Sequence, residues 1–87
     1  MSTTFETHWA MPAAVYVAAK RWGEQRGKGL EEALAEATRA NSWVRGAALL
    51  LIHNRGLRES IAKRVERGVL PPHKYLKEAE EALRSVG

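Results

Sequence analysis

The sequence predicts an all-α protein, a small bundle of four to five helices in a single domain. Three observations support this prediction. Alanine, glutamate, arginine and leucine dominate the 87 residues, and these are strong helix formers. No stretch alternates apolar and polar residues over a useful length, as a half-buried strand would. Apolar residues instead recur at spacings of three and four, between glycine and proline signals that mark helix ends.

The N-terminal third of the chain carries the first helical signals. Thr3 and Glu6 have the spacing of a capping box, which predicts a short first turn. Pro12 suits the first turn of the next helix, because the N–H that proline lacks would be unpaired there anyway. Gly27 or Gly29 is expected to end that helix.

Two helices are expected in the middle of the chain. The first covers residues 30–40 and has one apolar stripe. The second covers residues 43–54, after an Asn-Ser break at residues 41–42. Because it is apolar almost all round, it is predicted to be the central helix of the core. Gly46 is expected to allow another helix to approach closely, and Gly56 to stop the helix.

The last two helices are separated by a pair of prolines. A helix is expected over residues 57–67, capped by Gly68, and another from near Pro72 to Val86. The apolar inner stripe of the first of these two helices consists of Leu57, Ile61 and Val65. Its polar outer face consists of Ser60, Lys63, Arg64 and Arg67.

The middle of the chain is also strongly basic. Residues 39–77 contain nine basic and two acidic residues, nine minus two giving +7, in a chain whose formal net charge is +4. The nine basic residues are Arg39, Arg45, Arg55, Arg58, Lys63, Arg64, Arg67, Lys74 and Lys77. Most are arginines, whose planar fork suits phosphate oxygens better than a point charge does. The pattern predicts a surface that contacts the phosphate backbone of RNA or DNA.

Patterns that would indicate catalysis are missing from the sequence. It has no cysteine and no aspartate, and its histidines, His8, His53 and His73, lie far apart. A metal site needs several convergent ligands, and an activated nucleophile needs a neighbouring base. We therefore expect no enzyme activity, no catalytic residues, no metal, no cofactor and no small-molecule substrate.

Membrane and export signals are also missing from the sequence. The longest apolar runs, residues 13–19 and 47–52, are too short to cross a bilayer. Residues 1–10 lack the basic start and the apolar stretch of a signal peptide. The sequence thus predicts no membrane partner and a cytoplasmic protein.

Large aromatic residues are expected in the core of so small a chain, and this applies to Trp9, Trp22 and Trp43. Stacking on nucleic-acid bases is the alternative for Trp43 and Tyr75, because their sequence neighbours are basic.

One stretch matches the pattern of a known family. Asn, Arg, Gly and Leu at residues 54–57 follow the apolar helix and open another, which carries an Ile-Ala pair at residues 61–62. Upstream lie a Tyr-Ala-rich helix, at residues 16–19, and an acidic helix. Over residues 13–67 this layout resembles the small helical subunits of CRISPR effector complexes, in the type III-B and type I small-subunit family.

The resemblance implies a non-catalytic subunit of a ribonucleoprotein complex, with other protein subunits, including copies of itself, as partners. Its basic residues would contact the guide–target phosphate backbone without reading bases. Two alternatives stay open. One is a protein-interaction module, an adaptor or a phage-encoded inhibitor, that docks its basic face on an acidic partner; exposed Trp9 and Tyr75 would favour it. The other is a helix-turn-helix DNA-binding regulator with residues 43–54 as recognition helix.

Overall fold

The structure is a bundle of five helices, which confirms the predicted all-α class. The computed structural model describes residues 7–40 and 42–86, with the side chains of 9–40 and 43–86. In chain order the helices are α1 (Thr7–Arg26), α2 (Leu30–Ala37), α3 (Ser42–His53), α4 (Arg55–Glu66) and α5 (His73–Val86). No β-strand occurs in the described part of the chain. None of the helices there combines the length and the apolar character needed to cross a membrane.

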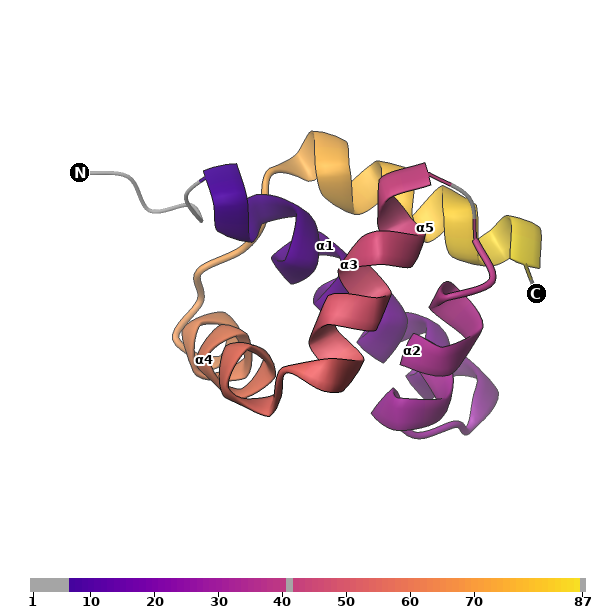
Figure 1. Ribbon diagram of the computed structural model, residues 1–87, viewed down its shortest axis with the longest axis horizontal. Helices are drawn as coiled ribbons and strands as arrows, with labels where there is room; N and C mark the ends of the chain where they lie inside the picture. Colours follow the sequence, from indigo (N-terminus) through magenta and orange to yellow (C-terminus); the bar gives the residue numbers. More distant parts are fainter. Residues whose placement is uncertain (1–6, 41, 87) are drawn as a thin grey trace.

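The central helix of the bundle is α1, not α3 as the sequence predicted. Helix α1 packs against each of the other four helices, and α3 crosses in front of it in Figure 1. Its residues 12–19 are all buried. They are proline, alanine, valine and tyrosine, so apolar side chains surround the helix, and a helix that is apolar all round has to be buried on every side.

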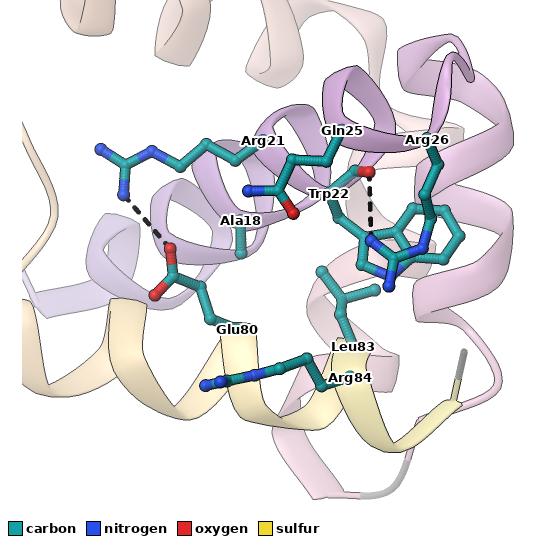
Figure 2. Close-up of a pocket in the computed structure, with 8 residues that line it drawn as sticks. All are labelled: Ala18, Arg21, Trp22, Gln25, Arg26, Glu80, Leu83 and Arg84. Atoms are coloured by element: carbon teal, nitrogen blue, oxygen red, sulfur yellow. Dashed lines mark hydrogen bonds and ion pairs between the residues drawn. The ribbon is translucent and has the colours of Figure 1, made fainter.

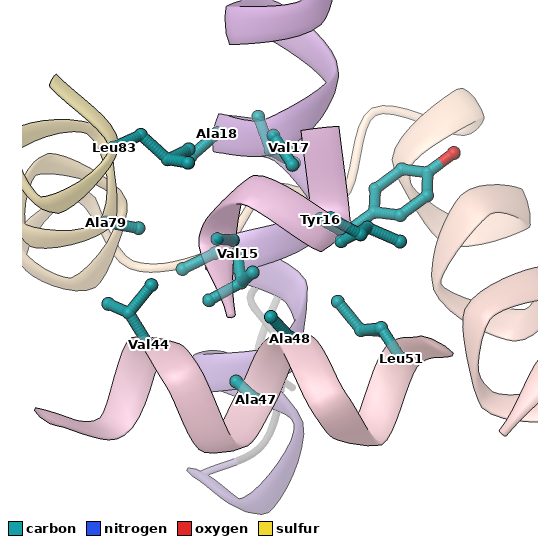
Figure 3. Close-up of a cluster of buried hydrophobic side chains, with 14 of the residues drawn as sticks. Val15, Tyr16, Val17, Ala18, Val44, Ala47, Ala48, Leu51, Ala79 and Leu83 are labelled. Atoms are coloured by element: carbon teal, nitrogen blue, oxygen red, sulfur yellow. The ribbon is translucent and has the colours of Figure 1, made fainter. Parts of the chain in front are cut away.

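The core forms where α1 meets α3 and α5. Val15 of α1, Val44 and Leu51 of α3 and Leu83 of α5 are each at most 1 % exposed. Figure 3 shows these side chains gathered from the three helices. Alanines complete the contact surfaces, and their small side chains let the helix backbones approach one another.

Helix α3 has one buried and one exposed side. Its two most exposed large apolar residues are Leu49 and Leu50, at 39 % and 45 %. Gly46 also faces open space, since a Cβ added there would meet nothing within 4 Å. The expected close approach at Gly46 is therefore wrong. An apolar run in the sequence marked α3 as a core helix, but one side of it lies at the surface.

The start of α1 also differs from the prediction. The helix is continuous from Thr7, so Pro12 lies inside it rather than in its first turn. Proline at this position removes one helix hydrogen bond. Pro12 is buried at the start of the buried stretch of residues 12–19. Thr3 and Glu6, the expected capping box, lie outside the described residues.

Helix α1 ends at a glycine, as predicted. Gly27 has a φ of +68°, which favours glycine, and the Lys28 N–H donates a hydrogen bond of 2.8 Å to the Gly23 carbonyl. This tight closure restricts residue 23. A Cβ at Gly23 would lie 2.7 Å from the Lys28 carbonyl oxygen, so only glycine fits there without a shift of the backbone.

Helix α2 is shorter than the expected 30–40. It ends at Ala37, because the N–H groups of Thr38, Arg39 and Ala40 bond to carbonyls three residues back and tighten the chain into a turn. The expected break at residues 41–42 falls partly outside the described residues, and α3 begins at Ser42.

Asn54, not Gly56, separates α3 from α4. The Asn54 side-chain oxygen accepts a 3.0 Å hydrogen bond from the Leu57 N–H and so caps α4. Gly56 lies in the first turn of α4, and that helix begins at Arg55, two residues before the expected start. Gly68, with φ +93°, caps the end of α4 as predicted.

The inner stripe of α4 follows the sequence pattern, and α5 is also buried along one side. Ile61 is buried, while Leu57 and Val65 are half-buried against the core. In α5 the buried residues are Leu76, Ala79 and Leu83.

Candidate nucleic-acid interface

The structure distributes the nine predicted basic residues over three helices and a turn. Arg39 lies in the turn after α2 and Arg45 lies on α3. Lys74 and Lys77 lie on α5. The other five belong to α4 or to the residue that caps its end, and they are Arg55, Arg58, Lys63, Arg64 and Arg67. In the view of Figure 1, α5 runs along the top of the molecule and α4 lies at the lower left.

Three of the α4 residues share one exposed face. Lys63, Arg64 and Arg67 have the spacing of a single helix face, together with Ser60, and all four are exposed. We call these four residues the α4 basic face. Ile61, on an adjacent side of the same helix, is fully buried and holds the helix on the core. The sequence therefore predicted this face correctly.

Lys63 and Arg67 are two cations of this face that form no ion pair with a described carboxylate. Among the described residues, no carboxylate lies within ion-pair distance of either side chain. Both charges are therefore available for an anionic partner.

Arg64 is held in place by an aromatic ring. Its guanidinium carbon lies 4.3 Å from the centroid of the Trp9 ring, which is half-buried beneath it. This cation–π contact engages the flat face of the guanidinium, whereas hydrogen bonds are made by its edge. The contact therefore helps to position Arg64 on α4.

Two of the nine residues are engaged with acidic side chains. Arg58 lies 3.9 Å from Glu31 of α2, and its side chain is only 15 % exposed. Arg39 lies 3.4 Å from Glu36. Binding a phosphate at either arginine would require that ion pair to open or be shared, so neither is as available as Lys63 or Arg67.

The remaining four, Arg55, Arg45, Lys74 and Lys77, are exposed but lie outside the α4 basic face. Arg55 and Lys63 each lie four residues from the exposed Glu59 of α4, and among the described residues neither is within ion-pair distance of it. The structure thus separates the predicted set into the α4 basic face, a pair of lysines on α5 and single cations elsewhere.

The aromatic residues are mostly engaged in packing. Trp22 is 6 % exposed, and Trp9 and Trp43 are half-buried against the core. The Trp43 ring meets Tyr75 edge to face at 5.7 Å, and its Nε1–H donates a 3.0 Å hydrogen bond to Glu78. Stacking a base on Trp43 or Tyr75 would have to compete with this arrangement.

No metal-binding group of three or more His, Cys, Asp or Glu residues occurs in the part of the chain that the structure describes. His53 and His73 are both exposed.

A second basic cluster lies outside the nine residues that the charge pattern of the sequence singled out. A pocket of about 280 Å³ opens between α1 and α5, and Figure 2 shows its lining. Its polar residues are Arg21, Gln25, Arg26, Glu80 and Arg84. The sequence indicates this pocket only through the four-residue spacings of Arg21 with Gln25 and of Glu80 with Arg84. The packing of α1 on α5, which joins the two pairs, is not visible in them.

Comparisons with known proteins found no match, either to a protein family, to a curated protein or to a solved structure. The resemblance to small CRISPR effector subunits therefore stays a prediction from the residues. The asparagine of the pattern has a local structural role in this protein, since the Asn54 side chain caps α4.

Proposed function

We propose that this protein is a non-catalytic nucleic-acid-binding subunit of a larger ribonucleoprotein complex. The observation that carries the proposal is the α4 basic face, on which Lys63, Arg64 and Arg67 are exposed side by side. Such a face neutralises phosphates and releases their counterions, which is the main source of sequence-independent affinity. Phosphate contacts position a protein on a strand without specifying its sequence.

The resemblance over residues 13–67 supports the same class of function. It would place the basic residues beside a guide–target duplex, which proteins of that kind contact through its backbone.

The proposal is tested by measuring binding to labelled single-stranded RNA, single-stranded DNA and duplex DNA across a salt series. We expect binding that is indifferent to sequence and weakens steeply with salt. The key variant is Lys63→Gln/Arg67→Gln, which should weaken binding to every sequence by roughly a hundredfold or more, since it removes two charge-assisted contacts of about 1.5–3 kcal/mol each.

The salt dependence of the double variant provides a sharper readout. Each lost phosphate contact should reduce the slope of log K against log salt by about 0.7 on single strands and about 0.9 on duplex DNA. Lys20→Glu is the matched control, because it also changes the net charge by two units and Lys20 is exposed on α1. Equal effects of the two variants would reject a specific role for α4, and so would unchanged binding in the double variant.

A protein-interaction module is the second candidate. The exposed Leu49 and Leu50 on α3 favour it, because neighbouring exposed apolar side chains are typical of docking surfaces. The expected anchors Trp9 and Tyr75 favour it less, since both are half-buried. The same two leucines argue against a helix-turn-helix regulator with α3 as recognition helix, because they offer no hydrogen bonds to base edges. If no nucleic acid binds even at low salt, the protein-interaction function becomes the leading candidate.

A further inference from the structure

The pocket between α1 and α5 has the charge of an anion-binding site. Three arginines and one glutamate line it, so its formal charge is three minus one, or +2. Arg21 forms a 3.2 Å ion pair with Glu80. Arg26 and Arg84 have no carboxylate within ion-pair distance among the described residues. Two positive charges are therefore uncompensated at this site.

The arginines come from both walls of the pocket. Figure 2 shows Arg21 and Arg26 reaching from α1 and Arg84 lying along α5, with Gln25 between the two α1 arginines. Ala18 and Leu83 form an apolar part of the lining. A ligand here would meet guanidinium groups from two helices and an apolar surface together.

Arg26 is already positioned. Its guanidinium carbon lies 4.5 Å from the centroid of the Trp22 ring, and its Nη1 donates a 3.5 Å hydrogen bond to the Trp22 carbonyl. Lys28 lies over the same ring at 5.2 Å and adds positive charge nearby. Because Trp22 is buried, it provides a fixed support, and less conformational entropy is lost when Arg26 binds an anion.

We infer that this pocket binds a phosphate monoester. A monoester carries about −1.5 to −2 charges near pH 7, which matches the +2 of the pocket, whereas a diester or a carboxylate carries one. Arginine's planar fork binds phosphate oxygens through two hydrogen bonds at a time. At about 280 Å³ the pocket is at the small end of ligand sites. It would hold the phosphate and the atoms next to it, with the rest of the ligand outside. The inference does not depend on the α4 basic face.

The first test compares two ligands of nearly equal size. Methyl phosphate and dimethyl phosphate are titrated into the full chain while the backbone amides are followed by NMR. We expect methyl phosphate to bind roughly tenfold more tightly, with the largest shifts at Gln25, Arg26 and Arg84, because the second charge gains a charge-assisted contact. Equal affinity for both ligands would overturn the inference, as would shifts confined to α4.

Variants test which side chains act. Arg84→Gln should weaken methyl phosphate binding roughly tenfold, while Lys20→Gln, an exposed charge on α1 outside the pocket, should leave it unchanged. Glu80→Gln should tighten binding, because it removes the negative charge and frees Arg21. Damage to the fold cannot produce tighter binding, so this variant gives a result of unambiguous sign. Weaker binding by Glu80→Gln, or equal effects at Arg84 and Lys20, would overturn the inference.

A last comparison identifies the source of the phosphate. A dinucleotide with a 5′-phosphate that binds more tightly than methyl phosphate assigns the site to a nucleic-acid end, and equal binding assigns it to a small phosphate ester. In Lys63→Gln/Arg67→Gln the affinity for methyl phosphate should be unchanged. The experiments thus distinguish a failure of the nucleic-acid proposal for α4 from a failure of the phosphate-monoester proposal for the pocket.

Discussion

The two basic regions of this protein differ in shape and in origin. The α4 basic face is the outer side of a single helix, and its cations lie within residues 63–67. The pocket is a hollow between two helices, and its ion pair joins Arg21 to Glu80, 59 residues further along the chain. One surface projects from the molecule, while the other is a half-open hollow.

This difference determines what each region can recognise. A projecting row of cations contacts a long polyanion, and its affinity depends on salt and on the number of contacts. A hollow lined from two sides selects by the size and charge of the ligand. The two regions also depend on different supports. The α4 basic face depends on the packing of α4 on the core, and the pocket depends on the tight turn at the end of α1. Two substitutions act on these supports one at a time, a third removes the cap of α4, and a fourth in α3 should leave both regions unchanged.

The largest effect is expected from Ile61→Ala, which removes the buried anchor of α4. Loss of a fully buried isoleucine should lower the free energy of unfolding by about 2–5 kcal/mol. Hydrogen exchange should rise more in α4 than in α5, because α4 packs mainly on α1 and α3. Equal loss of protection in α4 and α5 would show that the two regions open as one unit.

Gly23→Ala acts on the other region, at the end of α1. Its Cβ would lie 2.7 Å from the Lys28 carbonyl oxygen, so the backbone has to shift, and we expect a loss of stability of about 1–3 kcal/mol in urea unfolding. The shift should move Arg26 and weaken methyl phosphate binding while nucleic-acid binding by the folded protein stays the same. A loss confined to nucleic-acid binding would contradict the separation of the two regions.

Asn54→Ala removes the cap of α4. The Leu57 N–H loses its 3.0 Å bond, and the free energy of unfolding should fall by about 1 kcal/mol. Amide protection should decrease first in the opening turn of α4. Asn54→Asp is the matched control, because aspartate also caps helices and should keep most of the stability.

The smallest effect has the opposite sign. Gly46→Ala should raise the free energy of unfolding by about 0.5–1 kcal/mol, because alanine favours the helix and a Cβ at this site meets nothing within 4 Å. Neither basic region should change its affinity. A destabilised Gly46→Ala would mean that a close neighbour covers this side of α3.

Local signals predicted the helices well, and their errors have identifiable causes. Gly27 and Gly68 end α1 and α4 because both adopt positive φ angles that favour glycine. Gly56 looked similar in the sequence but lies inside α4, since the Asn54 cap had already set the break. The prediction of which helix is central to the core was wrong as well. The apolar run of α3 is richer in leucine than that of α1. Helix α1 is nevertheless central, because its alanines allow packing on all sides.

The sequence by itself determined the helical class, the helix ends marked by glycine and the α4 basic face, because these depend on residues within a few turns of one another. Only the tertiary structure decided which helix is central, which cations are paired with carboxylates of distant helices and where a pocket forms. Arg58 meets Glu31, and Arg21 meets Glu80, through the packing of separate helices. Helical periodicity shows which face a residue occupies but not which face it meets, so contacts between distant segments stay hidden until the helices are packed.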